Sequence, residues 1–192
     1  MRYPFRLPVL LVLLSALLLP GCAQNTVRLV YAPSADTALP QAGAPSVTVV
    51  TFADKRGSPP IGRRSNGSDF MPSSSVSDWV THSLATELAQ LGLNVTMADS
   101  ESQALASNAK FMVTGSIDEL WLTEKSSTDY DARMRGTIKV KDVQKPLLTR
   151  SFSSALARRV VPLSSVPQEM LSETLREMVL PMARAADEHI RR

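Results

Sequence analysis

The sequence predicts an α+β protein, a two-layer α/β sandwich with a mixed sheet of about five strands packed by an internal and a C-terminal helix. Three observations lead to this fold class. Residues 47–97 follow the order strand, helix, strand, which favours a right-handed βαβ crossover. Residues 110–156 contain three extended segments separated by short turns, which predicts an antiparallel meander. Residues 165–182 carry apolar side chains at helical spacing, which predicts the second helix.

Residues 1–21 have the pattern of a signal peptide. Arg2 and Arg6 give a positive start, and residues 9–19 are almost all aliphatic. This apolar run of about 11 residues is far shorter than the ~20 that a spanning helix needs. A permanent transmembrane anchor is therefore not expected.

The only cysteine of the chain closes this leader. Leu19, Pro20, Gly21 and Cys22 resemble the bacterial lipobox, and Pro20 departs from it at the most permissive position. The resemblance implies cleavage before Cys22, diacylglycerol on its sulfur, and a fatty acid such as palmitate on the new amino terminus. Several acyl chains hold a protein firmly on a membrane, whereas one does so only marginally. The alternative is an ordinary secreted protein with one stray cysteine.

The residue after the cysteine bears on location. Ala23 stands where lipoproteins retained on the inner membrane carry aspartate, so the resemblance implies the periplasmic face of the outer membrane. The inner membrane is the less favoured alternative.

Charge and cysteine usage exclude other classes. Losing Arg2 and Arg6 reduces the 21 basic residues to 19, against 18 acidic ones, so the mature chain has a net charge near +1. Such a balance does not favour nucleic-acid binding. With Cys22 acylated no thiol remains for a disulfide, and the fold must depend on an apolar core. The remaining length suits one ordinary domain.

Residues 22–46 are expected to be the lipidated cysteine and a flexible spacer, because proline, glycine and small residues dominate them. Within this stretch, residues 27–31 are a candidate for a short edge strand. The single periplasmic domain is expected over residues 47–192.

The first clear strand covers residues 47–52. Val47 and Val49 face one way, and Val50 and Phe52 face the other. Apolar residues on both faces indicate a buried, central strand.

Residues 54–74 follow as a predicted loop rich in glycine and proline, with a length typical of functional or disordered segments. The loop carries Lys55, Arg56, Arg63 and Arg64. Guanidinium groups suit bidentate contacts with phosphates, such as those of lipid A or phospholipid, and with acidic cell-wall groups. These residues are therefore a candidate partner- or anion-binding site. The alternative is a solvated basic loop.

Residues 75–91 are predicted to be a helix. Ser75 with Asp78 resembles a capping box, and Gly92 is placed to end the helix in a left-handed conformation. Residues 93–97 form the second strand. The buried stripe is expected to consist of Val76, Val80, Leu84, Leu88 and Leu91.

Residues 99–108 are predicted to form a short helix, capped by Asp99 or Ser100, with Leu105 pointing inward. Residues 110–123 are predicted to form a long strand.

Residues 130–140 show the cleanest alternation, which predicts a strand with one face on a core and one in water. Turns are expected at residues 125–128 and 142–146, and the last strand at residues 147–156. The core face would carry Tyr130, Ala132, Met134, Gly136, Ile138 and Val140, and the water face Asp131, Arg133, Arg135, Thr137 and Lys139.

The last helix is expected to begin at Ser165, with Gln168 at the capping-box position. Proline inside a helix costs ~3 kcal/mol, so a kink or break is expected just before Pro181. The apolar seam is expected to contain Leu171, Leu175, Val179 and Met182, flanked by Met170, Thr174 and Met178.

Several short stretches carry a family resemblance. They are residues 46–56, where a strand runs into Asp54-x-Arg56; Ile61, Gly62 and Arg63; and residues 84–95, 111–122 and 130–140. With the lipobox, they resemble the YajG-type family of bacterial lipoproteins. The element order is also similar to small periplasmic domains of penicillin-binding-protein activator lipoproteins and to the amino-terminal domain of TolB. The resemblance implies a location and a fold, and it supplies no catalytic residues.

Two sequence patterns resemble ligand-binding or catalytic motifs only weakly. The segment from Gly57 to Arg64 superficially resembles a phosphate-binding P-loop, but it lacks the lysine and the Ser/Thr, and Pro59 and Pro60 remove two amides. Neither a nucleotide nor any other cofactor is expected.

His82 and Asp78 lie one helical turn apart, which is half of a metal or acid–base site. The second histidine is His189, far along the chain, so an exposed surface histidine is the favoured interpretation and no metal is expected. Trp79 and Trp121 would form an interface only if both were exposed beside the loop.

We therefore expect a non-enzymatic, lipid-anchored envelope lipoprotein that binds a periplasmic or outer-membrane protein partner through the 54–74 loop and an exposed strand edge. One alternative is a lipid- or glycan-binding lipoprotein. Another is an auxiliary subunit of a cell-wall synthase or transporter, suggested by fold analogy. A hydrolase dependent on His82 is not favoured, because the sequence has no Gly-x-Ser-x-Gly elbow.

Overall fold

A long strand, β7 (Phe111–Glu124), is the centre of a nine-stranded mixed sheet. The computed structural model describes residues 25–33, 43–142 and 145–192. One edge of β7 pairs antiparallel with β8 (Asp129–Asp142), which in turn pairs antiparallel with β9 (Pro146–Arg159). The other edge of β7 is shared by three parallel strands: β2 (Ser46–Val50), β3 (Ala53–Asp54) and β4 (Gly62–Arg63).

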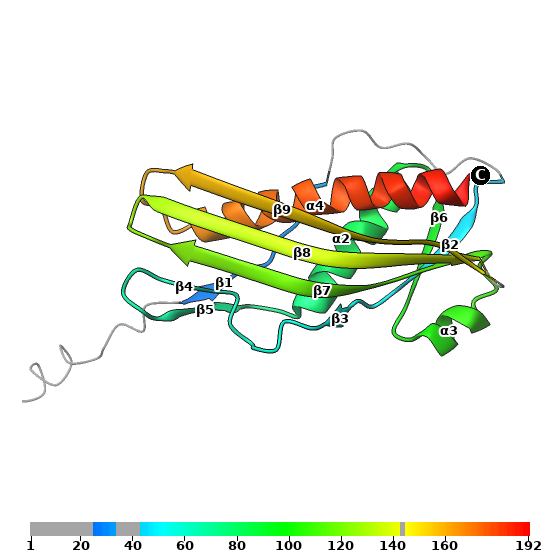
Figure 1. The fold of residues 1–192 in the computed structure, drawn as a ribbon, viewed down its shortest axis with the longest axis horizontal. Coiled ribbons are helices and arrows are strands. Elements are labelled where there is room, and N and C mark those ends of the chain that lie inside the picture. Colours follow the sequence, from blue (N-terminus) through cyan, green and yellow to red (C-terminus); the bar gives the residue numbers. More distant parts are fainter. Residues whose placement is uncertain (1–24, 34–42, 143–144) are drawn as a thin grey trace, which may run out of the picture.

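Two helices, α2 (Val76–Gln90) and α4 (Val166–Ile190), cover one face of this sheet (Figure 1). The α2 helix contacts β2 and its neighbours, and α4 contacts β7, β8 and β9. β6 (Asn94–Ala98) pairs parallel with β2 after the α2 crossover. The predicted βαβ unit and the antiparallel meander are therefore both confirmed.

The predicted number of strands is wrong, because the sheet of the described residues has nine strands rather than about five. Two of the extra strands lie in the stretch expected to be a loop, where β4 forms a hairpin with β5 (Asp69–Pro72) and also joins β7. Glycine makes the second contact possible, because a β-carbon at Gly62 would overlap the Leu122 carbonyl. Such pairing depends on residues distant in sequence. The local sequence therefore shows no periodic pattern from which these short strands could be predicted.

The α2 helix matches its prediction. The Asp78 amide donates to the Ser75 hydroxyl at 3.1 Å, and Gly92 has a φ of 85°. Leu93 is fully buried directly after this cap. Four members of the predicted stripe are buried, and Leu91 is half-buried.

The α4 helix does not break before Pro181, because it continues through that residue to Ile190, and the alternative of a kink there stays a prediction. Pro181 and Glu177 both face solvent, where water can satisfy the carbonyl that loses its donor. Met178 and Met182, each at most 1% exposed, hold the helix on the sheet from both sides of the proline. Ser165 is the N-cap residue of α4, as predicted, but its side chain makes no capping hydrogen bond, so the predicted capping box does not form.

Two side-chain directions differ from the prediction. Phe52 was expected to face the same way as Val50, but it lies in the main core with Val47 and Val49, because the strand is interrupted between β2 and β3. Leu105 was expected to point inward.

Leu105 is instead 61% exposed. In α3 (Glu101–Ala106), capped by Ser100, the smaller Ala104 takes the inward position. Because α3 has only six residues, a single side chain, that of Ala104, is buried against the sheet.

The alternation of β8 is confirmed, with all six predicted core positions buried. The α4 seam is buried as predicted. The space between the sheet and the helices is filled, since Leu84, Leu88, Ile138 and Leu175 are all completely buried.

Residues 25–33, expected to lie within the spacer, pack on the domain. β1 (Thr26–Val27) pairs parallel with β5, and Val27 is 5% exposed. The Tyr31 hydroxyl donates to Glu87 of α2 at 2.6 Å. The predicted leader and Cys22 lie outside the described residues. None of the described helices is both long and apolar enough to cross a membrane.

Candidate functional site

The four basic residues of the predicted loop do not converge on one site. Arg56 lies against Asp54 at 2.6 Å, and its side chain is only 7% exposed. It also donates to the Pro60 carbonyl at 3.4 Å. The hydrogen bond from Arg56 is the largest of the effects that lower the pKa of Asp54 below its ordinary value. This arginine therefore fixes the β3–β4 connection.

Arg64 has a similar internal role. It donates to Glu124 at 2.9 Å and to Asn25 at 3.2 Å, and the Glu124 side chain is 6% exposed. The pair ties the β4–β5 hairpin to the end of β7 and to the start of the described chain. Arg63 contacts Asp69 at 3.3 Å and is 61% exposed, so it is the most accessible of the three arginines. Anion binding by these arginines stays a prediction.

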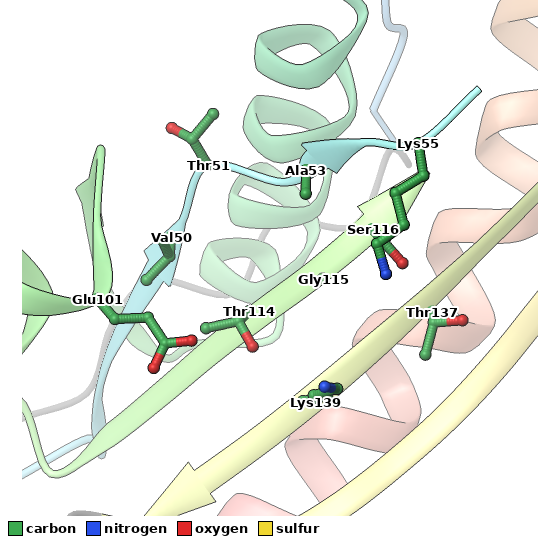
Figure 2. A pocket seen from close by; sticks show the side chains of 10 residues that line it. All are labelled: Val50, Thr51, Ala53, Lys55, Glu101, Thr114, Gly115, Ser116, Thr137 and Lys139. Carbon is green, nitrogen blue, oxygen red and sulfur yellow. The ribbon is translucent and has the colours of Figure 1, made fainter. Parts of the chain in front are cut away.

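The fourth residue, Lys55, lines a cavity of about 310 Å³ on the sheet face opposite the main core (Figure 2). The cavity lies where β2 and β3 meet β7 and β8, beside α3. Its lining consists of Val50, Thr51, Ala53, Lys55, Glu101, Thr114, Gly115, Ser116, Thr137 and Lys139.

Two lysines from different strands flank this cavity. Figure 2 shows Lys55 reaching over Ser116 from the end of β3, while Lys139 projects from β8. The Glu101 carboxylate enters from α3 toward Thr114, and Lys141 pairs with it at 3.0 Å. Neither lysine of the cavity has an ion-pair partner among the residues that the structure describes.

Hydroxyl groups line the cavity between the lysines. Ser116 and Thr137 each donate to Asp118 at 3.0 Å, which holds both side chains in place. Because both hydroxyl protons are donated to Asp118, the groups left to contact an anion here are the two ammonium groups and the Thr114 hydroxyl. Such a set suits one phosphate or carboxylate group at the surface.

Gly115 of β7 lies between the cavity and the Phe52 ring of the main core. A β-carbon there would overlap the Phe52 ring and would lie 2.7 Å from the Thr137 carbonyl oxygen. The glycine therefore lets β7 lie flat between the core and the cavity. A glycine inside a long strand signals a close approach of this kind, and this signal was available in the sequence.

The other candidate residues do not form a site. His82 is exposed on α2, as the favoured interpretation predicted. Trp79 is 7% exposed, so the two tryptophans do not form an exposed pair. Within the described part of the chain, no group of three or more histidine, cysteine or acidic residues is placed to hold a metal ion.

Solved structures define the class of fold to which this chain belongs. No protein-family model and no curated protein matches it. An uncharacterised protein is similar at a TM-score of 0.56 and 13% identity, over 83% of this chain and 98% of the other. The protein XCC0632 from Xanthomonas campestris, assigned to DUF330, is similar at 0.54 and 15%, over 82% and 89%. CT253 from Chlamydia trachomatis is similar at 0.52 and 9%, over 77% and 98%.

At these identities, the likeness shows a shared fold only. The chain is thus an α+β domain with a curled mixed sheet, of a kind also found in proteins from Xanthomonas campestris and Chlamydia trachomatis.

Proposed function

We propose that this chain is a lipid-anchored lipoprotein of the bacterial cell envelope, resembling the YajG type, which works by binding a protein partner rather than by catalysis. Cys22 would carry the lipid and hold the domain on the periplasmic face of the outer membrane. The lipobox pattern supports the anchor, and β1 begins at Thr26, four residues after Cys22, so a lipid there would hold the domain close to the membrane. Fatty-acid labelling of the wild-type chain and of Cys22→Ser tests this part.

The unpaired edge of β9 carries the proposal of partner binding. β9 spans 14 residues and, within the described chain, pairs only with β8. A long edge strand presents a row of free amide and carbonyl groups, which an extended segment of another protein can pair with. The side chains that share the open face with the cavity are small: Thr149, Ser151, Ser153, Ala155 and Ala157.

Crosslinking in intact cells tests this surface. A photoreactive residue at Ala155 should give an adduct with a defined envelope protein, whereas one at His82, exposed on α2, should not. Adding Ser153→Lys should remove the adduct, because lysine on an edge strand disfavours strand pairing. Identical adducts from both positions, or no effect of the lysine, would contradict the proposal.

Among the arginines of the basic loop, Arg63 is the one whose charge can be reversed with the least damage to the fold. Arg64→Glu would place a second carboxylate beside Glu124 and damage the fold, so Arg63→Glu alone is the informative variant. Loss of partner binding with Arg63→Glu and retention of thermal stability would add the loop to the interface.

The cavity favours a second candidate function, the binding of an acidic glycan or lipid head group. Lys55 and Lys139 would contact its phosphate or carboxylate. The filled core argues against an acyl chain inside the domain. Nuclear magnetic resonance shifts on addition of inorganic phosphate should appear at the cavity and disappear in Lys55→Ala/Lys139→Ala. The exposed Lys110→Ala serves as the matched control, and equal shifts in both variants would refute this candidate.

A further inference from the structure

One end of the domain must lie close to any lipid on Cys22. Three peptide units separate Cys22 from Asn25, which span at most about 11 Å when fully extended. Asn25 is fixed to the domain, because its carbonyl accepts a hydrogen bond from the Met71 amide at 2.9 Å and Val27 is buried directly after it. A lipid at Cys22 therefore holds this end at the membrane surface.

The same end carries the two most exposed large apolar side chains of the described residues. Val161 is 73% exposed and Leu163 is 62% exposed, both in the connection between β9 and α4. Leu163 lines one cavity together with Thr26 and Val27 of β1, so the connection lies beside the start of the described chain. Figure 1 shows this connection, in orange, at the end of the sheet where β9 finishes.

The connection is held in shape rather than hanging from the domain. The Val160 amide donates to the Thr128 carbonyl at 2.8 Å, and the Val166 amide donates to the Leu163 carbonyl at 3.2 Å. The two apolar side chains are thus presented on a fixed backbone, next to the β7–β8 turn. Ordering them costs little further conformational entropy when they contact a partner.

The charged side chains at this end of the domain do not form a patch of one sign. Arg28, directly after β1, and Glu169, in the first turn of α4, are both exposed and add one charge of each sign. The other charges form ion pairs: Arg63 with Asp69, Arg64 with Glu124, Lys125 with Asp131, Arg158 with Glu173, and Arg159 with Asp129. Such an electrically balanced surface gains little from anionic lipid.

We propose that Val161 and Leu163 insert into the interface of the membrane that holds Cys22, so that the domain stands on the bilayer with the β9–α4 connection downward. This inference rests on the proposed lipidation of Cys22. Two partly exposed apolar side chains are too few to anchor a domain alone, so they orient a domain that the acyl chains already hold. In this orientation the opposite end, with α3, points away from the lipid.

Depth-dependent fluorescence quenching tests the orientation. The mature lipidated chain, carrying Leu163→Cys labelled with an environment-sensitive dye, is reconstituted into vesicles containing nitroxide-labelled lipid. Leu105→Cys is the matched control, since Leu105 is 61% exposed, on α3. We expect several-fold stronger quenching at position 163 than at position 105. Equal quenching at the two positions would overturn the proposal.

A second measurement separates apolar insertion from electrostatic attraction. With the dye at Ser164→Cys, the pair Val161→Ser/Leu163→Ser should reduce quenching several-fold, whereas Leu105→Ser should not. Replacing zwitterionic by anionic lipid, or raising the salt concentration, should change the signal by less than about twofold. A strong response to lipid charge with no response to the serines would contradict the proposal.

Whether Cys22 carries fatty acid distinguishes an error in the proposed orientation from an error in the proposed lipidation. If fatty acid enters the chain but position 163 is not quenched, the orientation is wrong and the lipoprotein assignment stands. If the Cys22 thiol reacts with the dye in the otherwise unchanged protein, lipidation itself has failed, and the proposed function and this inference fall together.

Discussion

Replacing Tyr31 by phenylalanine should loosen residues 25–33, the segment that packs on α2. The Tyr31 hydroxyl donates to Glu87 at 2.6 Å, and Glu87 is 2% exposed. Burial, followed by the hydrogen bond to Glu87, raises the pKa of Tyr31 far above its ordinary value, so this side chain is the proton donor at any accessible pH. Removing the hydroxyl withdraws a charge-assisted bond from a buried carboxylate.

Hydrogen bonds to charged groups contribute about 1.5–3 kcal/mol, so we expect Tyr31→Phe to lose about that much unfolding free energy. For a domain of this size, the loss corresponds to a fall of about 3–10 °C in Tm. Urea titration and thermal unfolding measure both quantities. Hydrogen exchange should show faster opening of residues 25–33, because their contact with α2 is weakened.

Tyr130→Phe is the matched control. Tyr130 is 6% exposed, and its hydroxyl has no hydrogen-bond partner in the described part of the chain. The same chemical change there should alter stability by less than about 0.5 kcal/mol. Equal effects of the two substitutions, or a change below about 0.5 kcal/mol for Tyr31→Phe, would refute the assignment of the Tyr31–Glu87 contact as a stabilising link.

Three further outcomes test the fold around the candidate sites. Arg64→Ala leaves its buried carboxylate partner without a cation and should cost about 3 kcal/mol in urea titrations, whereas Arg63→Ala at the exposed pair should cost less than about 1 kcal/mol. Gly115→Ala should cost about 1–3 kcal/mol by overpacking against Phe52, and Phe52→Leu should recover part of that loss; additive losses would contradict the overlap. The lowered pKa of Asp54 means that its stabilising effect is present above about pH 4 and is lost as pH falls through the folded-state value. Asp54→Asn should therefore reduce the slope of stability against pH below about pH 4, and an unchanged slope would show that this carboxylate is not linked to folding.

Local patterns predicted the elements whose signals lie within one segment. The α2 stripe, the Gly92 cap and the β8 alternation are confirmed because each depends on residues a few positions apart. The prediction failed where contacts distant in sequence decide the outcome. Pro181 stays inside α4 because methionines on both sides of it are buried, and Leu105 turns outward because Ala104 fits against the sheet.

The candidate sites show the same division. Sequence composition singled out Lys55, Arg56, Arg63 and Arg64, but it could not show that each arginine faces its own carboxylate. Nor could it show that Lys55 shares a cavity with Lys139, more than eighty positions along the chain.

By itself, the sequence determined an α+β domain with one crossover and one meander, and it predicts an export-like leader that ends at Cys22. Periodicity and short motifs carry that information, because helices and strands impose a fixed spacing on apolar residues. Only the tertiary structure decided that the 54–74 stretch adds strands to the sheet, that β1 returns to the domain, and that Val161 and Leu163 are exposed beside it. These outcomes depend on which segments meet in space, and that is settled by packing of the whole core rather than by any single segment.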